Sequence, residues 1–292
     1  MIRYEGDLYR PPSEANSLIL QATLGCSYNE CTFCGMYRDK RFRVRPFDEL
    51  AAEIAWAQEN IPDVRKVFLA DGDALIAKAS FLERVLDALH DAFGELRRVS
   101  VYASPQSLQV RSVEEMARLR EKGLTLYYLG IESGHDPVLT RLEKGVDASE
   151  MVRVAGKATE AGVKLSTMVL LGAGGRAGSE AHARASAEVV NRIQPRFVST
   201  LVMSPVPNTP LFEQAERGEV DDLGPVELAS ELRTFIAGLE LEGSVFRSNH
   251  ASNHLTLAGS LPKDKPALVA ALDAVLRDPA SAPFVPNWMR RL

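Results

Sequence analysis

The 292-residue sequence predicts an α/β protein, a partial, TIM-type (β/α)6 barrel followed by a C-terminal capping extension. Apolar runs of strand length alternate with helix-like segments, which indicates a parallel sheet with right-handed crossovers. The runs are continuously apolar, as in strands that are covered on both faces. The alternation ends near Pro205, whereas a closed eight-unit barrel needs about 250 residues. We therefore expect a barrel core over 1–212 and an extension over 213–292 that closes it.

Six apolar segments are the expected strands: 17–23, 66–70, 98–102, 126–131, 164–171 and 197–203. Between them, capping boxes at Ser80-Phe81-Leu82-Glu83 and Ser112-Val113-Glu114-Glu115 predict two helix starts. Apolar periodicity predicts further helices near 148–161, 179–193, 225–240 and 265–276. Ligands of such sheets bind at the carboxyl ends of the strands, so the segment after each strand should carry the chemistry.

Composition excludes several classes of protein. Hydrophobic residues make up 46% of the chain and charged residues 25%, a balance typical of globular proteins. There is no apolar run of membrane-span length and no apolar signal core at the N-terminus, so we expect a cytoplasmic protein that does not bind membranes. The net charge of −5, with both signs interspersed, argues against non-specific nucleic-acid binding but leaves a local basic groove open.

The three cysteines, Cys26, Cys31 and Cys34, lie within nine positions, directly after the first predicted strand. Three thiolates from one loop can bind three irons of a four-iron cluster and leave the fourth iron open to another ligand. The alternative is a Cys3His zinc site that uses one of the five histidines. Zinc is the weaker interpretation, because such sites usually combine two short ligand pairs and this sequence has one Cys-x-x-Cys pair with no histidine nearby.

Three other strand ends carry polar residues or glycines. Asp71-Gly72-Asp73 follows the second strand and can be an ordinary turn or an acceptor for an ammonium group. Glu132 and Ser133 follow the fourth strand and can bind ribose hydroxyls or belong to the start of the next helix. Gly172-Ala173-Gly174-Gly175 follows the fifth strand, where glycines let a ring or a phosphate approach the backbone.

Together these motifs resemble the radical S-adenosylmethionine superfamily over about residues 17–212. In that family a cysteine loop after strand one holds a [4Fe–4S] cluster, and an aromatic residue usually precedes the last cysteine, as Phe33 does here. The usual spacing is Cys-x3-Cys-x2-Cys, whereas this chain has Cys-x4-Cys-x2-Cys. Gly130-Ile131-Glu132-Ser133-Gly134 and the segment 205–211 look like the branch with oxygen-independent coproporphyrinogen oxidase and the methylthiotransferases.

The resemblance implies a set of site residues. The three cysteines would bind three irons, and S-adenosylmethionine would chelate the fourth. The implied cofactor-binding residues are Phe33, Asp71, Gly72, Asp73, Glu132, Ser133, Gly172 and Gly175. Reductive cleavage of S-adenosylmethionine would give a 5′-deoxyadenosyl radical that abstracts hydrogen from a substrate, so an electron donor such as flavodoxin or ferredoxin is an expected partner.

The cysteine count narrows the expected reaction. No cysteine is left for a second cluster or for methyl transfer through a methylated cysteine, which favours hydrogen abstraction from a small-molecule substrate. Two other hypotheses remain open. One is a tRNA-modifying radical enzyme, and the other is a non-catalytic protein that binds a metal or a cluster.

The segment 246–254 of the extension is rich in functional side chains and includes His250 and His254. It can be a capping loop that satisfies its own hydrogen bonds. It can also be a substrate-facing wall in which the two histidines act as acid–base catalysts or anchors. We favour the wall for the segment as a whole, because a partial barrel needs a cover.

Overall fold

The structure, a computed structural model, describes residues 1–290 as two compact units. Unit 1 comprises 1–29, 36–129 and 154–165. Unit 2 comprises 30–35, 130–153 and, from residue 166 on, the rest of the described chain. The predicted boundary after residue 212 falls inside unit 2 and stays a prediction.

Unit 1 is built on parallel strands in the order β1, β4, β5 and β6. Their bounds are Leu18–Gln21, Lys66–Ala70, Arg98–Ala103 and Leu124–Glu132, the last of which continues into unit 2. The short strands β2 (Thr23–Leu24) and β3 (Arg43–Val44) pair antiparallel in a separate sheet. The helices are α1 (Phe47–Asn60), α2 (Ala79–Ala92), α3 (Pro105–Val110), α4 (Val113–Glu121) and the second half of α6 (Ala148–Glu160), with 3-10 turns η1 (Pro12–Glu14) and η2 (Ala74–Ile76).

The N-terminal segment of unit 1 closes one face of its sheet. Phe68, Tyr102 and Tyr128 lie on this face and pack edge to face, with ring centroids 4.9–6.1 Å apart. Glu14, which is fully buried, accepts hydrogen bonds from the Tyr128 hydroxyl and, at 2.6 Å, from the Arg98 guanidinium. A buried carboxylate needs such partners, so these contacts fix the chain before β1 against the sheet.

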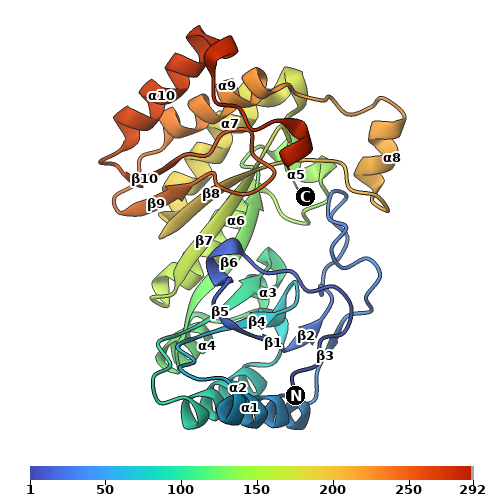
Figure 1. The fold of residues 1–292 in the computed structure, drawn as a ribbon, viewed down its shortest axis with the longest axis vertical. Helices are drawn as coiled ribbons and strands as arrows, with labels where there is room; N and C mark the ends of the chain where they lie inside the picture. The colour runs from blue at the N-terminus through green and yellow to red at the C-terminus, as the bar shows by residue number, and fades with distance from the viewer. Residues whose placement is uncertain (291–292) are drawn as a thin grey trace. The chain divides into compact units, whose positions relative to one another are not determined.

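Unit 2 contains the parallel strands β7 (Lys164–Leu171, whose first residues belong to unit 1), β8 (Phe197–Val202) and β9 (Ser244–Arg247). Strand β10 (Ala258–Leu261) pairs antiparallel with β9. Its helices are α5 (Asp136–Arg141), α7 (Gly175–Ile193), α8 (Pro210–Glu216), α9 (Pro225–Gly238) and α10 (Lys265–Arg277), followed by η3 (Pro279–Ser281) and η4 (Asn287–Met289). Helix α9 packs against both α7 and α10, as Figure 1 shows.

The two faces of β7 and β8 in unit 2 differ in exposure. Leu171 pairs with Val202, and both are buried beside Leu228 and Leu232 of α9. Leu170 pairs with Leu201 and therefore points to the opposite face, because neighbouring residues of a strand alternate. Positions on this second face, Met168, Ser199 and Leu201, are half-buried. We call this second face the open face of unit 2.

The α/β class and the six expected strands are confirmed, in a mostly parallel sheet that has eight strands within residues 1–290. The capping box at Ser112 is confirmed, because its hydroxyl accepts from Glu115 N–H and its N–H donates to the Glu115 carboxylate. The capping box at Ser80 is wrong, since α2 begins at Ala79 and its N-cap is Lys78, two residues before Ser80. Within residues 1–290, no helix has the length and apolar character that crossing a membrane requires.

Candidate active site

In unit 1, the turn after β4 holds the start of the cysteine loop. Gly72 N–H donates to Gly25 O at 3.1 Å, and Gly25 N–H donates to Asp71 Oδ2 at 3.1 Å. The Asp71 carboxylate is fully buried and also accepts from Gln21 Nε2 and Lys40 Nζ, each at 3.1 Å from Oδ2. Asp71 thus carries a paired negative charge whose hydrogen bonds fix the backbone immediately before Cys26.

Asp73 binds the cysteine loop at Ser27, the residue after Cys26. Its Oδ2 accepts from the hydroxyls of Ser27 at 2.6 Å and Ser104 at 2.7 Å, and its Oδ1 accepts from Ser104 N–H at 3.1 Å. Burial raises the pKa of Asp73, and these hydrogen bonds act against that rise. Both carboxylates of the motif are therefore bound within unit 1, and their assignment as acceptors for the cofactor's amino group stays a prediction.

Gly72 leaves room for neighbouring side chains. A Cβ at this position would lie 2.7 Å from Cδ2 of Tyr37 and 3.0 Å from Cβ of Cys26. Tyr37 is buried, so its ring has little freedom to move aside. The glycine is thus required by packing between the strand end and the first cysteine.

In unit 2, the second half of the cysteine loop is a turn that presents Phe33. Cys34 N–H donates to Cys31 O at 3.2 Å, and Thr32 N–H donates to Leu142 O at 3.1 Å. The Phe33 ring packs against a buried cluster that includes Leu170 and Leu142, and Leu201 of the open face packs against the same cluster. The turn that carries Cys31 and Cys34 therefore adjoins the open face of unit 2.

Glu132 ends β6 in a left-handed conformation, with φ +63°. Its Oε1 accepts from Lys144 Nζ at 2.8 Å, and both side chains are largely buried. A Cβ at Gly130 would lie 2.9 Å from the Glu132 carboxyl carbon and 3.2 Å from Lys144 Nζ, so the ion pair occupies the space above this glycine. A strained, charged residue at a strand end is typical of a functional site, although the ribose contact itself stays a prediction.

Ser133 is bound to His182, which the sequence analysis considered only as a zinc ligand. His182 Nε2 lies 3.0 Å from Leu170 O, and a carbonyl can only accept, so the ring proton is on Nε2. Nδ1 then accepts from the Ser133 hydroxyl at 2.8 Å, whose oxygen accepts from His135 N–H at 2.9 Å. Burial lowers the pKa of His182 to about 4, so the ring is neutral at pH 7.

The glycine-rich turn after β7 has two left-handed residues, Gly172 at φ +83° and Gly175 at φ +65°. Gly175 N–H donates to Gly172 O at 3.0 Å, and Arg141 of α5 donates to Ala173 O. Gly172 N–H donates to Glu231 Oε1 at 2.7 Å. The sequence analysis missed Glu231, although its position three residues after Leu228 on the apolar face of α9 was a signal of burial.

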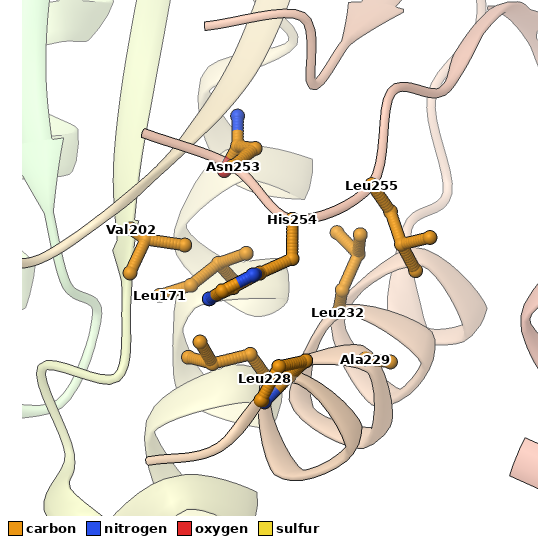
Figure 2. Close-up of a pocket in the computed structure, with 9 residues that line it drawn as sticks. Leu171, Val202, Leu228, Ala229, Leu232, Asn253, His254 and Leu255 are labelled. Carbon is orange, nitrogen blue, oxygen red and sulfur yellow. The ribbon is translucent and has the colours of Figure 1, made fainter. Parts of the chain in front are cut away.

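The two predicted catalytic histidines have different surroundings. His254 Nε2 accepts from the Arg290 guanidinium at 2.8 Å, and Nδ1 donates to Val285 O at 3.2 Å. Figure 2 shows the His254 ring among Leu171, Val202 and Leu228. Burial and the Arg290 charge lower the pKa of His254. Its contacts indicate an anchor for the segment 285–290.

His250 is bound to Ser252 through its ring nitrogen Nδ1. Ser252 N–H donates to its Nδ1 at 3.2 Å, which leaves the ring proton on Nε2, and burial lowers its pKa. Ser252 Oγ accepts from Val202 N–H at 3.1 Å, and Asn253 Nδ2 donates to Thr200 O at 2.7 Å. The segment 250–254 is thereby bound to the carboxyl end of β8. The catalytic role of either histidine stays a prediction.

The donor set fits an iron–sulfur cluster by its chemistry. Cys26, Cys31 and Cys34 form no disulfide and are partly buried, and thiolates are the ligands that such clusters use. In the described part of the chain, no three His, Cys, Asp or Glu side chains are arranged as a site for a single metal ion.

The comparisons with known proteins identify the family. The model of the radical SAM superfamily matches residues 20–175, and the chain belongs to this superfamily of enzymes, which use an iron–sulfur cluster and S-adenosylmethionine. A tRNA-2-methylthio-N(6)-dimethylallyladenosine synthase from Dehalococcoides mccartyi (strain CBDB1) is 27% identical over 77% of this chain and 52% of its own length. The chain thus spans about half the length of this curated relative.

Solved structures support the fold. Coproporphyrinogen III oxidase (HemN) from Escherichia coli has a TM-score of 0.57 and 16% identity, covering 76% of this chain and 51% of that one. The methyltransferase TsrM from Kitasatospora setae has a TM-score of 0.57 and 19% identity, and the match covers 90% of this chain and 52% of TsrM. The partial TIM-type barrel and the resemblance to this superfamily are confirmed.

Proposed function

We propose that Cys26, Cys31 and Cys34 bind a [4Fe–4S] cluster and that the enzyme uses it to form a 5′-deoxyadenosyl radical, which abstracts hydrogen from a small-molecule substrate. The observation that carries this proposal is the presence of three partly buried cysteines in one loop of a chain that has no other cysteine. When bound, the cluster would supply the electron that breaks the C5′–S bond of S-adenosylmethionine, after reduction by a donor of the flavodoxin or ferredoxin class.

The chain's own residues hold the parts of this site in place. Asp71 and Asp73 bind the backbone and Ser27 on either side of Cys26, which preorganises the first ligand. Glu132 at the end of β6 would accept from ribose hydroxyls, while Lys144 balances its charge. Gly172 and Gly175, which have no side chains, would let the adenine ring approach the backbone.

The substrate would bind over the open face of unit 2. Met168, Ser199 and Leu201 are half-buried there, and Phe33 of the cysteine turn packs on the same face. An apolar surface of this kind excludes water from a reactive radical. His250, whose ring proton is on Nε2, is the candidate acid–base residue of the segment 250–254.

The test is anaerobic reconstitution with iron and sulfide, followed by dithionite and S-adenosylmethionine. Release of 5′-deoxyadenosine is the expected result, and the Cys31→Ala variant should lose both the cluster absorbance and this product. Cluster formation without cleavage under several reductants would contradict the proposal, and a fully loaded, active Cys31→Ala variant would contradict the ligand assignment.

The second candidate is modification of tRNA, which the similarity to the tRNA methylthio synthase favours. The net charge of −5 weighs against it, because phosphate contacts require basic residues. Gel-shift titration of the reconstituted protein with bulk tRNA at physiological salt separates the two. Binding that weakens steeply with added salt would favour tRNA, and no shift would favour a small molecule.

A further inference from the structure

Glu231 of α9 lies directly against the glycine-rich turn. Its carboxyl group accepts from Gly172 N–H at 2.7 Å through Oε1 and from the Ser179 hydroxyl of α7 through Oε2. Glu231 is 2% exposed, so water does not provide an alternative partner for either donor. One side chain therefore joins α9, α7 and the turn after β7.

The charged groups around Glu231 do not explain its presence. His182 Nε2 is 3.6 Å from Oε1, but its proton points to Leu170 O and the ring is neutral at pH 7. Glu227, one turn earlier on α9, pairs with Arg176, and Arg233 pairs with Asp273 of α10. Burial raises the pKa of Glu231 to about 7. Retaining a buried acid without a charged partner is costly, which indicates that its hydrogen bonds have a use.

The geometry of the turn suggests that use. Gly172 has no side chain and stands at φ +83°, so its conformation is set by the hydrogen bonds on its peptide groups. Its N–H binds Glu231, and its C=O accepts from Gly175 N–H at 3.0 Å. Without the carboxyl group, the N–H would be buried and unsatisfied, and the turn would rotate towards another acceptor.

We propose that Glu231 is a positioning residue that holds the glycine-rich turn in the conformation that binds the adenine ring of S-adenosylmethionine. The proposal rests on the proposed function, in which Gly172 and Gly175 contact the cofactor. It gives the extension over 213–292 a second task besides covering the barrel, because the affinity for the cofactor would depend on α9.

Three variants test the proposal. Glu231→Leu removes the acceptor at similar volume, Glu231→Gln keeps an acceptor for Gly172 N–H, and Glu227→Gln makes the same change at the exposed site one turn earlier. Hydrogen exchange of the peptide 171–176 is measured on protein without a cluster. The dissociation constant for S-adenosylhomocysteine is measured by calorimetry on reconstituted protein. Thermal melting verifies that each variant is folded.

We expect Glu231→Leu to speed exchange at Gly172 and to weaken S-adenosylhomocysteine binding by about tenfold, the usual effect of a buried donor left unsatisfied. Glu231→Gln should restore both to within about threefold, and Glu227→Gln should match the wild type. A folded Glu231→Leu variant with wild-type exchange and affinity would overturn the proposal, and so would equal losses in the Leu and Gln variants.

Two further outcomes can be distinguished from a failure of the proposal: a Glu231→Leu variant that does not fold, and a wild type that does not bind or cleave the cofactor. If Glu231→Leu does not fold, Ser179→Ala removes the other hydrogen bond to the carboxyl group and should raise exchange at Gly172 to a smaller extent; unchanged exchange would count against the proposal. If the wild type binds no S-adenosylhomocysteine and releases no 5′-deoxyadenosine, the proposed function fails. The exchange measurement still decides whether Glu231 holds the turn.

Discussion

Replacing Gly72 by alanine tests whether the strand end supports the cysteine loop. The new Cβ would lie 2.7 Å from Cδ2 of Tyr37, whereas carbon atoms in contact are about 3.5–4.0 Å apart. The ring must therefore move by roughly 1 Å in a buried, packed position. Overpacking of this kind costs about 1–3 kcal/mol. Because Cys26 Cβ would also be only 3.0 Å away, we expect the first cysteine to shift with it.

Two assays read out the effect of Gly72→Ala. Thermal unfolding of the cluster-free protein should show a fall of about 2–4 °C for each kcal/mol lost. Iron bound after reconstitution should fall as well. Gly94→Ala is the matched control, since a Cβ at Gly94 meets no atom of the described chain within 4 Å.

A double-mutant cycle identifies the cause. Tyr37→Ala removes the obstructing ring, so the additional cost of Gly72→Ala should drop by at least about 1 kcal/mol in that background. An equal cost in both backgrounds would show that the ring is not the obstacle. Wild-type stability and iron content in the single variant would refute the packing argument altogether.

Two other variants give independent tests. The pKa of His182 is about 4 in the folded protein and 6.5 in the unfolded chain. As the pH falls, the unfolded chain is therefore protonated at this histidine before the folded protein is. The free energy of unfolding should fall by about 3 kcal/mol between pH 6.5 and pH 4. Denaturant titrations should show this loss in the wild type and not in His182→Gln, and an equal pH dependence in both would contradict it. Gly130→Ala should displace the Glu132–Lys144 pair and cost about 3 kcal/mol or more, while Gly156→Ala, in a helix with open space around it, should gain up to about 1 kcal/mol. Equal melting temperatures for these two glycine variants would refute the account of the ion pair.

The strands of the barrel could be predicted because parallel strands covered on both faces form continuous apolar runs, such as 66–70 and 164–171. Strands β9 and β10 could not be predicted from the sequence. Ser244–Arg247 has two apolar residues, and Ala258–Leu261 has mostly small ones, so their strand state depends on pairing with each other and with β8. Tertiary context overrides a weak local preference in such segments.

The chemistry-bearing residues could be identified from the sequence, but their partners could not. The run of cysteines and the carboxylates after the second strand stand out locally. Asp73 accepts hydrogen bonds from Ser27 and Ser104, which are separated from it by 46 and 31 positions in the chain. Gly172 donates to the carboxyl group of Glu231, which is 59 positions away. No local pattern encodes such pairs. His254 illustrates the same difficulty, because its sequence context suggests chemistry and its contacts indicate an anchor.

The buried carboxylate of Glu14 has a practical consequence for handling this protein. Trimming the chain to the start of β1 would leave the Tyr128 hydroxyl and the Arg98 guanidinium without their acceptor inside the fold. Any shortening of this segment should therefore keep Glu14, and also Glu5, whose backbone exchanges two hydrogen bonds with the buried side chain of Gln21. Met1 is 79% exposed, so a label or an affinity tag there would leave these contacts in place. A fusion partner joined there would leave the face closed by Glu14 intact.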